Sequence, residues 1–258
     1  MSNYYFVIAA LPPLELGLRP ELSFKEVREM LRLNLSSSDF RQTSYLLGPI
    51  DLYNLRAFWL GLPLDDRGNY SDGKYLEEAL LVREGLPSYV VDFLDRHESN
   101  QERLHNFSAL FAELYRVEPP HWAPFVHTYF AREREIRLVL LALRAKELKR
   151  DIVRELQFEN FDDSLVAHIL AQKDAPEYVP PAEYEDLKAL FVENKTDPYR
   201  LERALLKYRF EKIEDGEENH DFTINRILAY LARLLLVESI SRLDLEWGKK
   251  KLEEIELL

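Results

Sequence analysis

The segment from Trp122 to Asp151 constrains the possible folds of this chain more than any other part of the sequence. Its apolar residues recur at the spacing of an α-helix, on two different faces. One stripe comprises Phe125, Tyr129, Ile136, Leu140 and Leu143, and the second comprises Leu138, Leu141, Ala145 and Leu148. A helix that is apolar on two faces has to be covered on both of them. We therefore expect one long helix at the centre of a bundle.

The composition favours helices throughout the chain. Only 8 Gly and 13 Pro occur among 258 residues that are rich in Leu, Glu, Arg and Ala, which are strong helix formers. Hydrophobic residues make up 47% of the chain, enough for a sizeable core. The predicted fold class is mainly α, in stacked helical bundles.

One segment departs from the helical pattern, and several boundaries carry recognisable signals. Residues 4–11 are short, aromatic and β-branched, so we expect an extended segment or a strand there. Ser23 and Glu26 have the spacing of a capping box, and Asp163 precedes another short apolar run. Asp51 is predicted to cap the run LYNLRAFWL. Helices are expected over about 22–34, 39–47, 51–60, 74–83, 87–95, 101–115, 122–151, 163–172, 182–193, 198–212, 221–243 and 244–258.

Pro119-Pro120 is the clearest break in the middle of the chain. It suggests an N-terminal helical lobe over residues 1–118 and a C-terminal lobe over 119–258 that is built on the long helix. Because no long linker separates the two, a single continuous domain is the alternative.

The charge and the hydropathy pattern limit the partners. The formal net charge of −12 argues against nucleic acid, because phosphate binding needs a basic face. It also disfavours direct contact with anionic lipid. No apolar run reaches the ~20 residues of a membrane-spanning helix, and the first residues do not resemble a signal peptide. We expect a cytoplasmic protein that meets a membrane only through another protein.

Motifs for catalysis and cofactors are missing from the sequence. There is no phosphate-binding G-x-x-x-x-G-K-[ST], no G-x-G-x-x-G and no cysteine. The six histidines have no H-E-x-x-H spacing. A helical di-metal site would need Glu-x-x-His on two helices, and we do not expect one here. The sequence therefore predicts a protein that is not an enzyme and has no cofactor or metal. A helical metal enzyme is the least favoured alternative.

Two short groups of residues are candidates for structural or partner-contact roles. The first group is Asp51, Asn54, Arg56 and Trp59. Asp51 and Asn54 are interpreted as helix-start residues or as the lining of an interior, and Trp59 as core or as an aromatic anchor for a partner.

The second group is Arg132, Glu133, Glu135 and Arg137, in the run Arg-Glu-Arg-Glu and just after it. This run is either a solvated turn with local ion pairs or a buried polar network that fixes how bundles pack.

The segments YYFVIAALPPL, LSFKEVREMLRLNLSSSDF and DFTINRILAYLARLLLVESISRLDLEWGKKKLEEI resemble an uncharacterised bacterial family that is encoded in V-type ATPase operons. The segments DLYNLRAFWLGLP and YFAREREIRLVLLALRAK resemble helices of the V-type ATPase connector subunit, which is designated C, or d in eukaryotes. The chain is shorter than this connector subunit, and its start differs from the helical start of that family.

The resemblance implies an all-helical, non-catalytic component that couples the central stalk to the membrane rotor ring. Its partners would be the stalk proteins and the ring, on the cytoplasmic face of the membrane. A helical adaptor or assembly factor that is absent from the finished motor is the alternative.

Overall fold

The structure is a computed structural model that describes residues 4–116, 122–215 and 222–256. Among these residues all regular structure is helical, and no strand is present. The predicted mainly-α class is confirmed. The break expected at Pro119-Pro120 lies outside the described residues.

The chain divides into two compact units, which are residues 1–40 with 123–258, and residues 41–122. In the first unit the elements are α1 (Tyr5–Ala9), α2 (Phe24–Asn34), α9 (Pro124–Glu147), α10 (Ile152–Glu155), α11 (Ser164–Ala171), η1 (Ala182–Tyr184), α12 (Glu185–Asn194), α13 (Pro198–Glu214) and α14 (Ile224–Glu256). In the second they are α4 (Gly48–Leu60), α5 (Gly73–Val82), α6 (Ser88–Arg96), α7 (Asn100–His105) and α8 (Ser108–Arg116). Helix α3 (Ser37–Tyr45) runs across the boundary. Residues 1–40 thus group with the C-terminal part of the chain.

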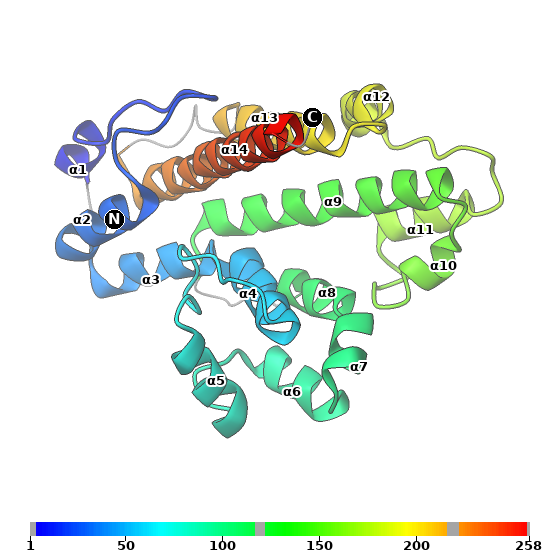
Figure 1. Ribbon diagram of the computed structural model, residues 1–258, viewed down its shortest axis with the longest axis horizontal. Coiled ribbons are helices and arrows are strands. Elements are labelled where there is room, and N and C mark those ends of the chain that lie inside the picture. The colour runs from blue at the N-terminus through cyan, green and yellow to red at the C-terminus, as the bar shows by residue number, and fades with distance from the viewer. Residues whose placement is uncertain (1–3, 117–121, 216–221, 257–258) are drawn as a thin grey trace. The chain divides into compact units, whose positions relative to one another are not determined.

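Helix α9 is the central helix of the first unit. It packs against α10, α11, α12 and α14, so it has neighbours on more than one side (Figure 1). Its buried residues in the shared core are Ile136, Leu138, Val139, Leu140, Ala142, Leu143 and Ala145. Both predicted stripes are therefore largely correct. The predicted end at Asp151 was wrong, because the chain leaves the helix at Leu148 and Lys149 has a φ of 53°. Leu148 is consequently 57% exposed instead of buried.

Helix α14 is one continuous helix, although the sequence predicted a break at Asp244. Asp244 does not cap a new helix, because its carboxylate faces α13. There Tyr199 Oη donates to Asp244 Oδ1 at 2.8 Å, and Arg203 Nε lies 3.4 Å from the same oxygen. An acidic residue signals a helix start only where its side chain turns back to the backbone. Here a neighbouring helix competes for it.

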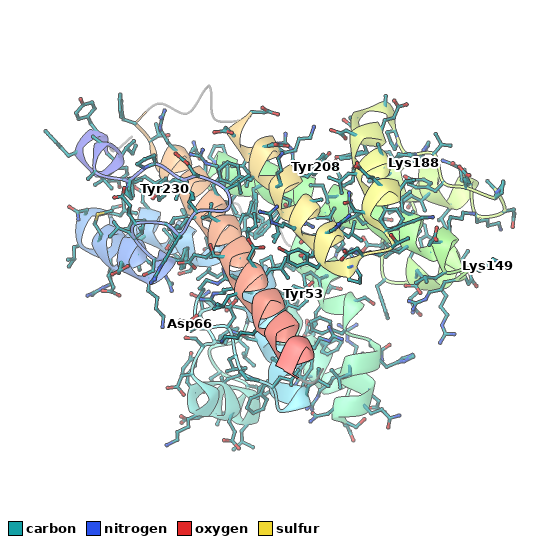
Figure 2. All side chains as sticks on the ribbon, turned by 45° about the horizontal axis from the view of Figure 1, so that its top comes forward. Tyr53, Asp66, Lys149, Lys188, Tyr208 and Tyr230 are labelled. Atoms are coloured by element: carbon teal, nitrogen blue, oxygen red, sulfur yellow. The ribbon has the colours of Figure 1, made fainter. Side chains whose placement is uncertain are left out.

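Polar side chains also join the other helices of the first unit. Phe24 N, at the start of α2, donates to Glu238 Oε1 of α14 at 2.7 Å. Between α12 and α13, Tyr208 Oη donates to Asp186 at 3.2 Å, and Lys212 Nζ lies 2.9 Å from the same carboxylate. Figure 2 shows Tyr208 on α13. The unit is therefore held by polar contacts between helices as well as by its apolar core.

The N-terminal segment is helical, which corrects the prediction of an extended segment. Tyr5–Ala9 forms α1, and none of its residues is buried. Tyr4, just before it, is buried; its N–H donates to Phe222 O at 3.0 Å and its hydroxyl to Asp39. β-Branched residues favour strands only when a neighbouring strand can satisfy the backbone, and local helical bonds satisfy it here.

The other boundary signals had mixed outcomes. The capping box is present, with Ser23 as the N-cap of α2, and Asp163 caps α11. The helix predicted over 101–115 is two helices, α7 and α8. Asn106 ends α7, since its backbone N–H and its side-chain amide both donate to Glu102 O.

In the second unit, α4 packs against α7 and α8, and α6 packs against α8. The core of this unit contains Leu52, Leu55, Trp59, Tyr70, Leu76, Val90, Phe93, Leu94, Leu110, Phe111 and Leu114. This small core is rich in aromatic rings, and it positions one face of α4.

We predict that Leu140→Ala destabilises the protein by about 2–5 kcal/mol, because it removes buried methyl groups from α9 and leaves a cavity. Leu148→Ala is the matched control at an exposed position, and should change the free energy of unfolding by less than about 0.5 kcal/mol. Urea midpoints at equal m-values measure both. Equal effects of the two substitutions would contradict the assigned core face.

Candidate functional site

Helix α4, which carries the first group of candidate residues, has two distinct faces. Its inward face consists of Asp51, Leu52, Asn54, Leu55 and Trp59, all of which are buried. Its outward face includes Tyr53, Arg56 and Leu60, which are exposed and spaced at i, i+3 and i+7. The candidate residues are thus divided between a packing face and an exposed face.

Asp51 is not the N-cap of α4, so that interpretation was wrong. The helix begins three residues earlier, with Pro49 in its first turn, where a missing N–H costs nothing. The buried Asp51 carboxylate instead accepts from Asn69 Nδ2 at 2.8 Å and from Tyr70 N at 3.2 Å. The side chain therefore fixes the loop that follows α4. Burial, with the nearby Asp51 charge, raises the pKa of Tyr70 above its usual range.

Asn54 fixes the same loop from one turn further along α4. This side chain is 1% exposed. Its amide donates to Asp65 O at 2.9 Å and Tyr70 O at 3.1 Å, and its Oδ1 accepts from Asp65 N at 2.7 Å. Asp65 in turn holds the buried Arg67 at 2.6 Å. A buried amide with three good hydrogen bonds holds the loop against the helix.

Trp59 and Arg56 take different positions on α4. Trp59 is buried and stacks on Phe93, with ring centroids 6.1 Å apart, so it belongs to the core. Arg56 is exposed, and its guanidinium lies 5.7 Å from the centre of the Phe107 ring. Arg56 is therefore the one residue of this first group that remains accessible to a partner.

The second group lies on α9 and makes contacts with distant parts of the sequence. Arg209 Nε of α13 donates to Glu133 Oε2 at 2.9 Å, with the two side chains 19% and 13% exposed. Burial disfavours the charge of Arg209. The Glu133 carboxylate outweighs that effect and raises the pKa of Arg209, so the guanidinium stays charged. Arg132 is exposed and reaches the carbonyl of Lys212.

Arg134 and Arg137 converge on one carboxylate. Glu159, whose side chain is 5% exposed, accepts from Arg134 Nη2 at 3.2 Å and also from Arg137. Arg134 Nη1 further donates to Asp163 Oδ2 at 2.9 Å. Burial opposes ionisation of Asp163, but hydrogen bonds from Val166 N and Arg134 outweigh it and lower the pKa of Asp163. The N-cap of α11 is thereby attached to α9.

Glu135 completes the set of contacts. Its Oε2 accepts from the hydroxyl of Tyr184, in η1, at 2.5 Å. Burial and this carboxylate together raise the pKa of Tyr184 above its usual range. The run on α9 is thus a partly buried polar network with partners in α13, η1 and the residues around 160. The solvated-turn interpretation fails for Glu133, Arg134, Glu135 and Arg137.

Sequence reasoning missed the residues that complete both clusters. Asn69, Glu159 and Arg209 were not singled out, although each partners a candidate residue. They lie 18, 22 and 76 positions from their partners, and no local pattern links residues at such separations. The two clusters lie in different units.

Neither cluster resembles a metal centre. No group of three or more His, Cys, Asp or Glu side chains is arranged to hold a metal ion within the described ranges. No described helix is long and apolar enough to span a bilayer.

The comparisons with known proteins identify a family. A family model described as "Protein of unknown function (DUF2764)" matches residues 1–256. The chain belongs to this family. An uncharacterised protein of Chlamydia muridarum is 29% identical, over 99% of this chain and 98% of its own length. Another, from Chlamydia pneumoniae, is 31% identical with the same coverage. No solved structure matches. The similarity to these family members therefore extends along nearly the whole chain.

We predict that Glu133→Lys destabilises the protein by about 3–5 kcal/mol, because it leaves the largely buried Arg209 without its carboxylate and opposite a second cation. Glu193→Lys makes the same charge change at an exposed position of α12. This control should change the free energy of unfolding by less than about 0.5 kcal/mol. Denaturant titrations compare the variants, and a near-silent Glu133→Lys would rule out a buried network.

The loop that follows α4 approaches the helix closely at Gly68. A Cβ at Gly68 would lie 2.7 Å from Asn54 Nδ2 and 2.9 Å from Asp51 Oδ1. Gly68→Ala should therefore displace the side chains of Asn54 and Asp51 that bind the loop. The free energy of unfolding should fall by about 1–3 kcal/mol, the usual range for overpacking. Gly73→Ala is the control, since its Cβ would meet nothing within 4 Å. Thermal unfolding should show a lower Tm for Gly68→Ala only.

Proposed function

We propose that this chain is a non-catalytic structural component of a V-type ATPase or ATP synthase, similar to the connector subunit, and that it couples the central stalk to the membrane rotor ring. It would then act on the cytoplasmic face of the membrane through its protein partners. Such a protein transmits force through packed helices, so its polar residues serve packing and contact instead of chemistry.

The observation that carries the proposal is the use of polar residues on the two helices that resemble the connector subunit. On α4, Asp51 and Asn54 bind the loop over 65–70. On α9, Glu133 and Glu135 bind α13 and η1. These side chains act as joints between segments of the chain. Rigid joints of this kind suit a protein that transmits mechanical load.

The outward face of α4 is the surface we assign to the partner. Tyr53, Arg56 and Leu60 lie on it in one exposed row. Tyr and Arg are enriched among the residues that dominate binding energy at protein interfaces. Arg56 rests on the Phe107 ring, which limits its freedom before binding.

The second candidate is an adaptor or assembly factor for the same pump. One observation favours it: the family relatives match along nearly the whole chain, whereas the resemblance to the connector subunit is confined to two helices. A protein that shares only part of the connector's pattern can bind the same partners without being built into the motor.

We expect the protein to sediment with V-type ATPase membranes from native cells and to co-purify with the rotor ring after detergent extraction. Arg56→Glu should reduce co-purification about tenfold or more, because it reverses a charge at the contact. Lys74→Glu, an equal charge change at an exposed position of α5, is the control.

The distribution of the protein distinguishes the two candidates. Recovery in fixed ratio with the complete pump supports the structural component, and recovery with partial complexes alone supports the adaptor. Mass spectrometry that finds no pump protein attached would contradict both.

A further inference from the structure

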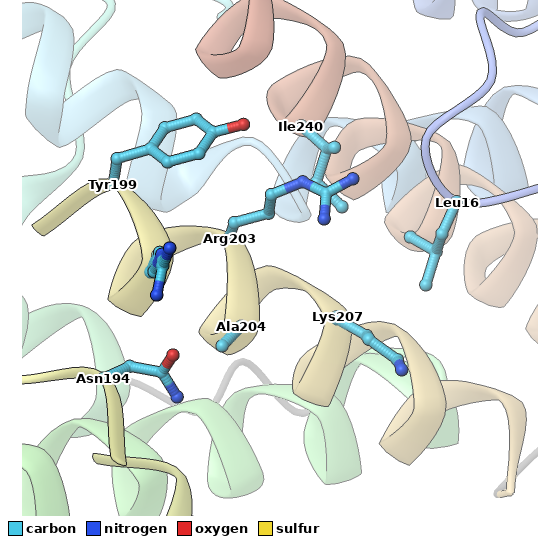
Figure 3. A pocket seen from close by; sticks show the side chains of 8 residues that line it. Leu16, Asn194, Tyr199, Arg203, Ala204, Lys207 and Ile240 are labelled. Carbon is cyan, nitrogen blue, oxygen red and sulfur yellow. The ribbon is translucent and has the colours of Figure 1, made fainter. Parts of the chain in front are cut away.

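A pocket of about 590 Å³ opens in the first unit between α13 and α14. Asn194 of α12 and Leu16, from the segment before α2, complete its wall (Figure 3). The volume falls in the usual range for sites that take small molecules, ~300–1,000 Å³. Arg209 does not line this pocket, so the pocket is separate from the polar network on α9.

The charge of the lining is unusual for this chain. Arg200, Arg203 and Lys207 line the pocket, and no carboxylate is among its lining residues. The whole chain has 46 acidic residues against 34 Lys and Arg. Three cations without an acidic lining residue therefore form a local exception, and point to a ligand that is negatively charged.

The three cations are spaced along one face of a single helix. Positions 200, 203 and 207 are i, i+3 and i+7 of α13, so neighbouring side chains are about 5–6 Å apart at Cβ. With a rise of about 1.5 Å per residue, the row is roughly 10 Å long. One phosphate can contact two neighbours in such a row, and two linked phosphates can contact all three.

The carboxylates nearest to these cations hold them loosely. Arg200 lies 3.4 Å from Asp197, Arg203 3.4 Å from Asp244, and Lys207 3.6 Å from Glu211. All three cations are half-exposed or more, and ion pairs at such exposed positions are weak. An incoming anion can therefore take over the cations at little cost.

Two of the three carboxylates also accept hydrogen bonds from other groups. Asp197 caps α13 by accepting from Tyr199 N and Arg200 N, and Asp244 accepts from the Tyr199 hydroxyl. The contrast is with Arg209 on the same helix, which is only 19% exposed and lies 2.9 Å from Glu133.

The remaining lining gives the pocket two chemical parts. Leu16, Ala204 and Ile240 supply apolar surface, and Asn194 and Tyr199 supply polar groups. In Figure 3 the side chain of Arg203 extends from α13 toward Ile240, so a cation lies beside this apolar surface.

We propose that the pocket binds a small molecule with a diphosphate group, which the three cations hold while its other part lies against the apolar surface. Arginine forks suit phosphate oxygens because they donate two parallel hydrogen bonds.

Isothermal titration with pyrophosphate, at constant ionic strength, tests the proposal on the full chain. We expect saturable 1:1 binding, and at least tenfold weaker binding to Arg203→Gln and to Lys207→Gln. Arg154→Gln, at an exposed position of α10, is the matched control and should bind as the parent does. Orthophosphate should bind at least tenfold more weakly, because it cannot contact the whole row.

A second variant separates the pocket from its surface charge. Ala204→Phe keeps all three cations and fills the cavity from α13, so it should abolish binding, with circular dichroism confirming the fold. The proposal is overturned if Ala204→Phe binds normally, if Arg154→Gln weakens binding equally, or if potassium chloride reproduces the signal. Equal affinity for orthophosphate would overturn the diphosphate assignment.

Discussion

The ion pair between Glu133 and Arg209 is the interaction on which the arrangement of the first unit depends. Helix α9 is covered on more than one side, yet it carries charged residues in its middle turns. A charge taken out of water is costly unless a partner and hydrogen bonds replace the water. Helix α13 therefore has to lie where Arg209 reaches Glu133. The residues around 160 have to lie where Glu159 meets Arg134 and Arg137. Apolar packing alone would allow these helices to slide, and the paired charges fix their register.

In the second unit, a buried polar side chain also fixes the position of a neighbouring segment. Asn54 presents donors and an acceptor to a buried core, and the backbone of Asp65 and Tyr70 satisfies all of them. Gly68 allows the loop to come this close, since a side chain there would meet Asn54 and Asp51. A loop with few apolar residues is thus held by hydrogen bonds. The exposed row of Tyr53, Arg56 and Leu60 on the opposite face of α4 takes no part in these hydrogen bonds. It remains available to a partner.

Much of the fold could be predicted because its signals are local. The stripes on α9, the capping box at Ser23 and the cap at Asp163 each depend on residues within a few positions. The failures share a different cause. Asp51 was predicted as a helix cap and Asp244 as the first residue of a helix, but neighbouring segments use their carboxylates. Tyr5–Ala9 has strand-like composition but no strand beside it among the described residues. The candidate residues on α9 were found as an unusual run, whereas their partners, tens of residues away, had no local signal.

Helix α13 shows how one element can serve both stability and binding. On one side Arg209 is buried, closely paired and ionised, so moving it would leave Glu133 in a low-dielectric surrounding without compensation. On another side Arg200, Arg203 and Lys207 have long, exposed pairs with carboxylates, two of which already bind elsewhere. The first arrangement holds the helix in place, and the second leaves three cations in weak, exposed ion pairs. The backbone of the helix is already ordered, so binding would have to order the side chains alone. Arg200, Arg203 and Lys207 are therefore better placed than Arg209 to bind a ligand.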